Sequence, residues 1–186
     1  MPDASGHANA RDYDFGITLP EGHWALLVEQ VRRINQLEAD IGTIERWLSH
    51  ANARDPACKS VAEIPGVGLM TATEIVASMG SPAAFKDARE FAAWIGLVPR
   101  QTGTGSRVRQ LGIRKRDDAY LRTLLMHGAR AIVCSDRPRN WAGLAELLKR
   151  RPYSVAVAAV ANKLARTIWA VLARDRAWRP TAWQAA

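Results

Sequence analysis

Apolar residues recur every seven positions between residues 24 and 50. The members of this stripe are Leu27, Ile34, Ile41 and Leu48, with Leu37 and Ile44 beside them. The period is close to that of a coiled coil, and charged residues occupy the opposite face. It predicts a long helix that either packs on its own domain or pairs with a second copy of the chain. Glu38 and Glu45 fall at seam positions, and of the two alternatives we favour pairing, which predicts a homo-oligomer through helix 24–50.

The pattern in the rest of the chain predicts shorter amphipathic or buried helices, separated by turns rich in glycine and proline. We predict these helices at residues 69–79, 87–94, 118–133, 141–149 and 154–173. No run of residues predicts a β-strand, and no repeat of 20–50 residues is present. The pattern therefore indicates an all-α protein. We expect a disordered lead (1–18), a long helical linker (19–55), a compact helical domain (56–176) and a tail (177–186).

A tight turn follows the long helix. Asp55-Pro56 ends that helix, and the run Ile64-Pro-Gly-Val-Gly68 then separates two apolar helical segments. This arrangement resembles a helix-hairpin-helix, in which Gly66, Gly68 and the next helix N-terminus offer backbone N–H groups to a phosphate. The alternative is an ordinary helical hairpin with a glycine cap. We favour the phosphate contact.

Composition narrows the classes of partner. The 186 residues carry a formal net charge of +8 with a pI near 10.2, and 48% are hydrophobic. The charge favours a polyanion, with nucleic acid the first candidate. The two cysteines, Cys58 and Cys134, have neither disulfide-framework nor zinc-site spacing and predict reduced thiols. We expect no membrane span, since no apolar run approaches roughly 18 residues.

One basic stretch, residues 96–122, carries the candidate chemistry. It is a glycine-punctuated loop with hydroxyl residues at its centre. Its cations are Arg100, Arg107, Arg109, Arg114, Lys115, Arg116 and Arg122. Glycine allows close approach of backbone to a ligand, and clustered guanidiniums suit a phosphate backbone. The alternative is a solvated loop whose charges bind nothing specific.

Several segments in and around this stretch carry a family resemblance. They are Ala93–Gln101, the Thr-Gly-Thr-Gly run 102–105, Leu111–Ile113, Lys115-Arg116, Tyr120–Leu125 and Ala161–Arg166. Together they resemble the C-terminal domain of the insertion-sequence 110 / 116 / 902 family of transposases. The resemblance runs from about residue 19 to 180 and is strongest over 64–133.

This resemblance implies a function. Such transposases have an N-terminal RNase-H-like domain with an acidic metal-binding quartet, followed by a helical linker and a C-terminal domain with a serine nucleophile. The present sequence begins near the linker and has no place for the quartet. We therefore expect a partial transposase with no metal ligand or cofactor of its own and with Mg²⁺ bound by the missing domain. The implied setting is the bacterial cytoplasm, in association with the nucleoid.

The resemblance places the nucleophile at Thr104, where the family often has serine. Ser106 lies two residues further on, where the family usually has glycine, and Arg114 and Asp117 are further departures. A hydroxyl is a weak nucleophile unless it is activated, and the threonine methyl group crowds the approach to phosphorus. The alternatives are that Thr104 attacks, that neither residue does, or that Ser106 does, and we rank them in that order.

We predict the DNA-binding C-terminal portion of a transposase that contributes to strand transfer, with DNA and, as a further candidate, a guide RNA as partners. The expected DNA-binding residues are Gly66, Gly68, Arg100, Arg107, Arg109, Lys115, Arg116 and Arg122. The alternative is a non-catalytic, dimeric nucleic-acid-binding module from a truncated transposase gene. A third hypothesis is a helical assembly protein whose charge serves solubility alone.

Overall fold

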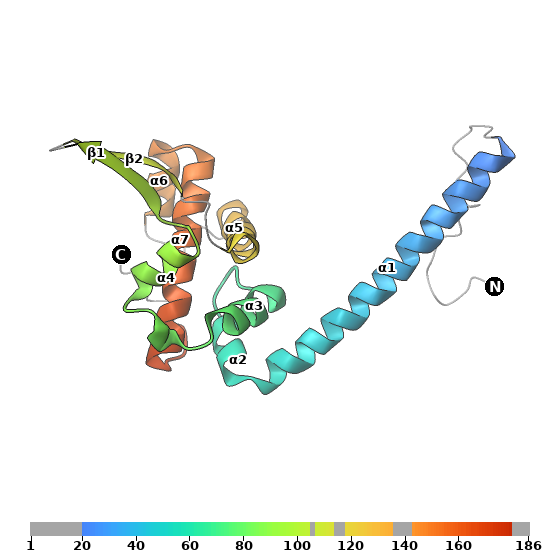
Figure 1. The fold of residues 1–186 in the computed structure, drawn as a ribbon, viewed down its shortest axis with the longest axis horizontal. Coiled ribbons are helices and arrows are strands. Elements are labelled where there is room, and N and C mark those ends of the chain that lie inside the picture. Colours follow the sequence, from blue (N-terminus) through green and yellow to red (C-terminus); the bar gives the residue numbers. More distant parts are fainter. Residues whose placement is uncertain (1–19, 105–106, 114–117, 136–142, 180–186) are drawn as a thin grey trace. The chain divides into compact units, whose positions relative to one another are not determined.

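The computed structural model describes residues 20–104, 107–113, 118–135 and 143–179 (Figure 1). The chain divides into two compact units, one ending at Trp47 and one beginning at Leu48. Helix α1 (Glu21–Arg54) makes up the described part of the first unit and enters the second. The predicted long N-terminal helix is thus confirmed.

The second unit is helical apart from one β-hairpin, within the part of the chain that the structure describes. Its helices are α2 (Pro56–Ala62), α3 (Leu69–Met79), the 3₁₀ helix η2 (Pro82–Ala84), α4 (Ala88–Trp94), α5 (Ala119–Cys134), α6 (Leu144–Arg150) and α7 (Tyr153–Arg174). The all-α class predicted from the apolar pattern is therefore confirmed.

Short polar side chains begin several of these helices. Asp55 accepts a hydrogen bond from the N–H of Ala57 at 2.8 Å, and Pro56 supplies the first helical residue of α2. Asp118 accepts from the N–H of Leu121 at 2.9 Å and caps α5. Each carboxylate satisfies an amide that has no partner within its helix, which explains why the helices begin at these residues.

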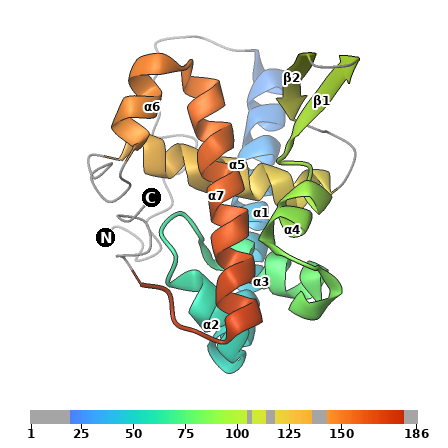
Figure 2. The same ribbon diagram turned by 90° about the vertical axis from the view of Figure 1, so that its left-hand side faces the viewer.

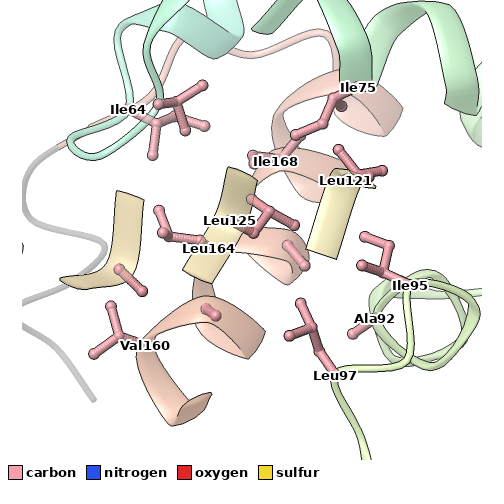
Figure 3. Close-up of a cluster of buried hydrophobic side chains, with 14 of the residues drawn as sticks. Ile64, Ile75, Ala92, Ile95, Leu97, Leu121, Leu125, Val160, Leu164 and Ile168 are labelled. Atoms are coloured by element: carbon pink, nitrogen blue, oxygen red, sulfur yellow. The ribbon is translucent and has the colours of Figure 1, made fainter. Parts of the chain in front are cut away.

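Helix α7 is the centre of the core. Its buried stripe of small and branched residues includes Val160, Leu164 and Ile168. These side chains meet Leu121 and Leu125 of α5, and α5 crosses α7 (Figures 2 and 3). Helices α3 and α4 and the segment after each of α2 and α4 add Ile64, Ile75, Ala92, Ile95 and Leu97 to the cluster (Figure 3). Val61 of α2 and Leu144 of α6 also belong to it. Small residues on α7 allow its neighbours to pack closely.

Helix α7 is also the one described helix long and apolar enough to cross a membrane, with a mean hydropathy of 1.5 in its most apolar window. The same apolar residues fill the core of this unit. The core packing accounts for the hydropathy.

The expectation of no β-strand was wrong at one place. Strands β1 (Pro99–Thr104) and β2 (Arg107–Ile113) form an antiparallel two-stranded sheet in the segment we interpreted as a loop. Three glycines and the density of charge hide the alternation that usually indicates a strand. A two-residue connection makes the pairing local, so the hairpin needs no long apolar run to specify its register.

Candidate nucleic-acid interface

The β-hairpin places the backbone of the candidate nucleophile opposite one predicted cation, and a second cation pairs with a residue two positions earlier in β1. Thr104, the last residue of β1, pairs with Arg107, the first of β2, and Thr102 pairs with Arg109. The ladder is irregular between Pro99 and Gln101, where two residues of β2 lie opposite the single residue Arg100, so the bulge is in β2 and faces Arg100. Thr104 therefore lies where the chain turns, at the end of the hairpin.

Several predicted site residues have no described geometry. Ser106, Lys115 and Arg116 lie outside the described residues. At Arg100, Thr104, Arg107 and Arg109 the description covers the backbone, not the side chains. The assignment of Thr104 or Ser106 as nucleophile thus stays a prediction, as do the phosphate contacts of these cations.

Arg122 connects two helices within the domain. It lies in the second turn of α5, and its Nη1 donates a hydrogen bond to the carbonyl oxygen of Ile95 at 3.1 Å. Ile95 is the C-terminal cap of α4, where carbonyl groups lack partners within the helix and the helix dipole attracts a cation. This contact explains why Arg122 is half-buried, and the explanation does not require a bound ligand. Binding of DNA by Arg122 stays a prediction.

The Pro-Gly-Val-Gly turn joins α2 to α3 as a helical hairpin. Gly66 has φ of +83°, which glycine adopts without strain, and the N–H of Val67 donates to the carbonyl of Ile64 at 3.0 Å. Gly68 is the N-cap of α3 with an ordinary φ of −88°, and no side chain caps that helix. The helical hairpin is as predicted, while its identity as a phosphate-binding helix-hairpin-helix stays a prediction.

The two glycines of the turn have different surroundings. A Cβ on Gly66 would lie 2.6 Å from Cδ1 of Ile132 and 2.9 Å from the carbonyl oxygen of Gly128, both on α5. A Cβ on Gly68 would meet no atom within 4 Å. Gly66 is therefore explained by its conformation and its packing, and Gly68 is the residue of the pair that presents an exposed backbone.

Gly128 is a residue that the sequence reasoning missed. A Cβ at this position would overlap the carbonyl oxygen of Gly66, so the turn and α5 touch backbone to backbone. Glycine inside a helix costs about 1 kcal/mol relative to alanine, which makes a glycine in an apolar helix a signal for close packing. The sequence alone therefore indicated that Gly128 packs closely against another segment, but it did not identify Gly66 as the contact.

The solvent-facing side of α5 lies beside this contact. Tyr120, His127, Arg130 and Cys134 are exposed there. Among the residues described, no group of three or more His, Cys, Asp or Glu could bind a metal ion.

Both cysteines are free thiols. Cys58 is buried beside α3, 3.9 Å from the carbonyl oxygen of Ala72, and burial raises the pKa of its thiol, with a smaller contribution from Asp55. Cys134 is exposed and lies 3.0 Å from the hydroxyl of Tyr153. Neither thiol lies next to the β-hairpin residues in sequence or belongs to a metal cluster.

Comparison with known proteins identifies the family of this domain. Residues 58–145 match the model of the Transposase IS116/IS110/IS902 family. The match covers the α2–α3 turn, the β-hairpin and α5, the same elements that hold the candidate site. This chain belongs to the IS116/IS110/IS902 transposase family. The resemblance inferred from the sequence is thereby confirmed.

Curated relatives give the same answer over more of the chain. A probable family 20 transposase of Pseudomonas aeruginosa is 42% identical over 167 residues, which are 87% of this chain and 49% of that protein. The transposase for insertion sequence element IS1111A of Coxiella burnetii is also 42% identical, over 78% of this chain and 41% of its own. The transposase for IS1328 of Yersinia enterocolitica is 36% identical over 83% and 49%. The chain thus spans about half the length of the curated relatives it matches.

Proposed function

We propose that this chain is the part of a transposase that binds DNA and brings a hydroxyl group to the strand being transferred. The observation that carries the proposal is the register of the β-hairpin. Thr104 pairs with Arg107 at the turn, within a segment that matches the transposase family. This register places the backbone of a cationic residue opposite that of the candidate nucleophile. A guanidinium suits a phosphodiester, because it stabilises the charge on the phosphate during transfer.

The proposed chemistry is attack of the Thr104 hydroxyl oxygen on phosphorus. A new O–P bond forms, the bond between phosphorus and the leaving oxygen of the DNA strand breaks, and the proton lost by the threonine hydroxyl is balanced by protonation of the leaving oxygen. The protein's contribution is to position the phosphate and to stabilise its charge. Ser106 is the alternative nucleophile, and a third possibility is that neither hydroxyl reacts.

DNA also contacts the α2–α3 turn in this proposal. The exposed Gly68 and the uncapped first residues of α3 present amide N–H groups that bind phosphate without reading sequence. We further propose that an acidic, Mg²⁺-binding part of the transposase lies outside this sequence and that a guide RNA is a second candidate ligand. The proposed location is the bacterial cytoplasm, at the nucleoid.

Salt dependence of DNA binding tests the hairpin. Affinity for a duplex should fall steeply with salt, and Arg107→Ala or Arg109→Ala should lower the log–log slope by about 0.9 for each phosphate that the variant no longer neutralises. Arg174→Ala is the matched control. Arg174 is the last residue of α7, at the end of that helix away from the hairpin (Figure 1). Equal slopes for all three variants and the parent chain would remove the hairpin from the DNA contact.

Strand transfer tests the hydroxyl. Thr104→Ala should leave duplex affinity nearly unchanged, because one neutral hydrogen bond contributes about 1 kcal/mol. In a longer transposase chain that includes the acidic domain, Thr104→Ala should abolish transfer and Thr104→Ser should retain it. If Ser106→Ala abolishes strand transfer while Thr104→Ala remains active, Ser106 is the nucleophile. If both alanine variants still carry out strand transfer, neither hydroxyl is the nucleophile, and this chain acts as a non-catalytic DNA-binding module.

A further inference from the structure

Helix α7 holds the segment 82–97, which contains α4, at both of its ends. Near the start of this segment, Nε1 of Trp169 donates a hydrogen bond to the carbonyl oxygen of Pro82 at 3.1 Å. At its end, Nδ2 of Asn162 donates to the carbonyl oxygen of Leu97 at 3.2 Å. Asn162 is a half-buried polar residue of an alanine-rich helix, and the Leu97 carbonyl satisfies its amide.

The chain leaves α4 through a Schellman motif. The N–H of Gly96 donates to the carbonyl of Ala93, and the N–H of Leu97 donates to the carbonyl of Ala92, both at 2.9 Å. Gly96 has φ of +80°, which the motif requires and which glycine adopts without strain. Leu97 is buried in the core (Figure 3). The chain therefore leaves α4 in one defined direction.

Side chains of two other helices hold this exit. Arg122 of α5 donates to the carbonyl of Ile95 at 3.1 Å, and Asn162 of α7 donates to that of Leu97. Strand β1 begins two residues after Leu97, at Pro99, whose ring restricts φ. The two hydrogen bonds thus join the base of the β-hairpin to the two helices at the centre of the core.

The β-hairpin is long relative to its base. It extends away from the helices (Figures 1 and 2), and the six residues of β1 span about 20 Å. A rotation of about 3° at the base would therefore move the far end, where Thr104 lies, by about 1 Å. A misplacement of about 1 Å can lower the rate of a positioned reaction about 100-fold. Small changes at the base thus have large effects on attack at phosphorus.

We infer that Asn162 is a positioning residue, which sets the direction of the β-hairpin and thereby the position of the Thr104 hydroxyl. The inference rests on the proposed function, in which Thr104 is the nucleophile. Asn162 acts through the Leu97 carbonyl and not through a contact with DNA. Attraction between cations and phosphates tolerates the same displacement, because it extends over about 10 Å at 0.1 M salt. Loss of the hydrogen bond should therefore affect strand transfer more than DNA affinity.

The distance between the β-hairpin and the core tests the inference without strand transfer. Spin labels are attached at Val108→Cys in β2 and Ala77→Cys in α3, in the full chain with Cys134→Ser and with the buried Cys58 left in place. Labelled chains are diluted with unlabelled ones, and double electron–electron resonance gives the distribution of the label distance. Asn162→Ala should broaden or shift this distribution, since alanine keeps the helix but has no donor. Asn162→Asp, whose ionised carboxylate cannot donate, should do the same.

Trp169→Phe is the matched control. It removes a hydrogen bond from the same helix to the same segment, at the end away from the β-hairpin. Urea unfolding shows whether each variant is folded and how much stability it has lost. Trp169→Phe should keep the label distances of the parent chain. An unchanged distribution in both Asn162 variants, or an equal broadening in Trp169→Phe, would overturn the inference.

Strand transfer in the longer transposase chain gives the second readout. Asn162→Ala should lower the rate constant of transfer about 10- to 100-fold and keep the dissociation constant for DNA within about twofold of the parent value. Trp169→Phe should change neither. A parent rate in Asn162→Ala, together with an inactive Thr104→Ala, would overturn the inference. If Thr104→Ala and Ser106→Ala are both active, the proposed nucleophile is wrong, while a broadened label distance still supports Asn162 as the residue that directs the β-hairpin.

Discussion

Replacement of Gly128 by alanine should destabilise the domain, although the same replacement usually stabilises a helix. In a solvent-exposed helix interior, Gly→Ala stabilises by about 1 kcal/mol. At Gly128 the added Cβ would overlap the carbonyl oxygen of Gly66, and backbone cannot rotate away as a side chain can. The turn or α5 must then move.

The size of the effect follows from two opposing contributions. Overpacking costs roughly 1–3 kcal/mol, and a clash between two backbone segments lies in the upper part of that range, at about 2–3 kcal/mol, because no side chain can rotate to relieve it. The gain in helix propensity offsets about 1 kcal/mol of this cost. We expect Gly128→Ala to lower the free energy of unfolding by about 1–2 kcal/mol. Gly66→Ala should cost more, about 2–4 kcal/mol, because alanine must also adopt a φ of +83°.

Urea unfolding followed by circular dichroism measures these differences, with linear extrapolation to water. Gly68→Ala is the matched control in the same turn, because its Cβ meets nothing within 4 Å and its φ is ordinary. It should cost less than about 1 kcal/mol. Shortening Ile132 to valine should relieve part of the Gly66→Ala effect and none of the Gly128→Ala effect. A Gly128→Ala variant as stable as the parent chain would refute the backbone contact.

Two further predictions concern the same domain. Arg122→Ala should destabilise it by about 1–2 kcal/mol in the urea assay by leaving the Ile95 carbonyl unpaired, and unchanged stability with weakened DNA binding would instead make Arg122 a DNA ligand. Hydrogen bonds from the amides of Glu90 and then Arg89 lower the pKa of Asp87 below its ordinary 3.8. The carboxylate therefore stabilises α4 above about pH 3.8, and this stabilisation is lost as the pH falls further. In acid unfolding, the stability of the Asp87→Asn variant should thus depend less on pH below about 3.8 than the stability of the parent chain does.

The fold could be predicted where its cause is local. The apolar period specifies α1, and the Asp-Pro pair specifies the break before α2. The β-hairpin was missed because cross-strand pairing is a relation between two segments, and because its glycines are a residue type that is depleted in strands. A connection of two residues, Gly105-Ser106, was the signal available for it.

The candidate site also has a part that the sequence predicted and a part that required the structure. Glycine at 66 and 68 predicted a turn between helices, but both glycines were assigned to phosphate contact. The structure separates them, because the partner of Gly66 is a helix about 60 residues further along the chain. Arg122 likewise looked like one cation of a basic stretch until its contact with Ile95 was known. Contacts between segments distant in sequence assign residues of one type to different roles.

Helix α5 links these segments, and DNA binding can measure that link. Gly128 contacts the turn, Arg122 contacts α4, and five residues separate the end of β2 from the start of the helix. The proposed contacts of the turn are neutral N–H groups, whereas those of the β-hairpin are cations that release counterions. If Gly128→Ala displaces the turn alone, DNA affinity should fall with an unchanged salt slope. If the slope falls as well, the displacement has reached the β-hairpin, and α5 transmits the position of one DNA contact to the other.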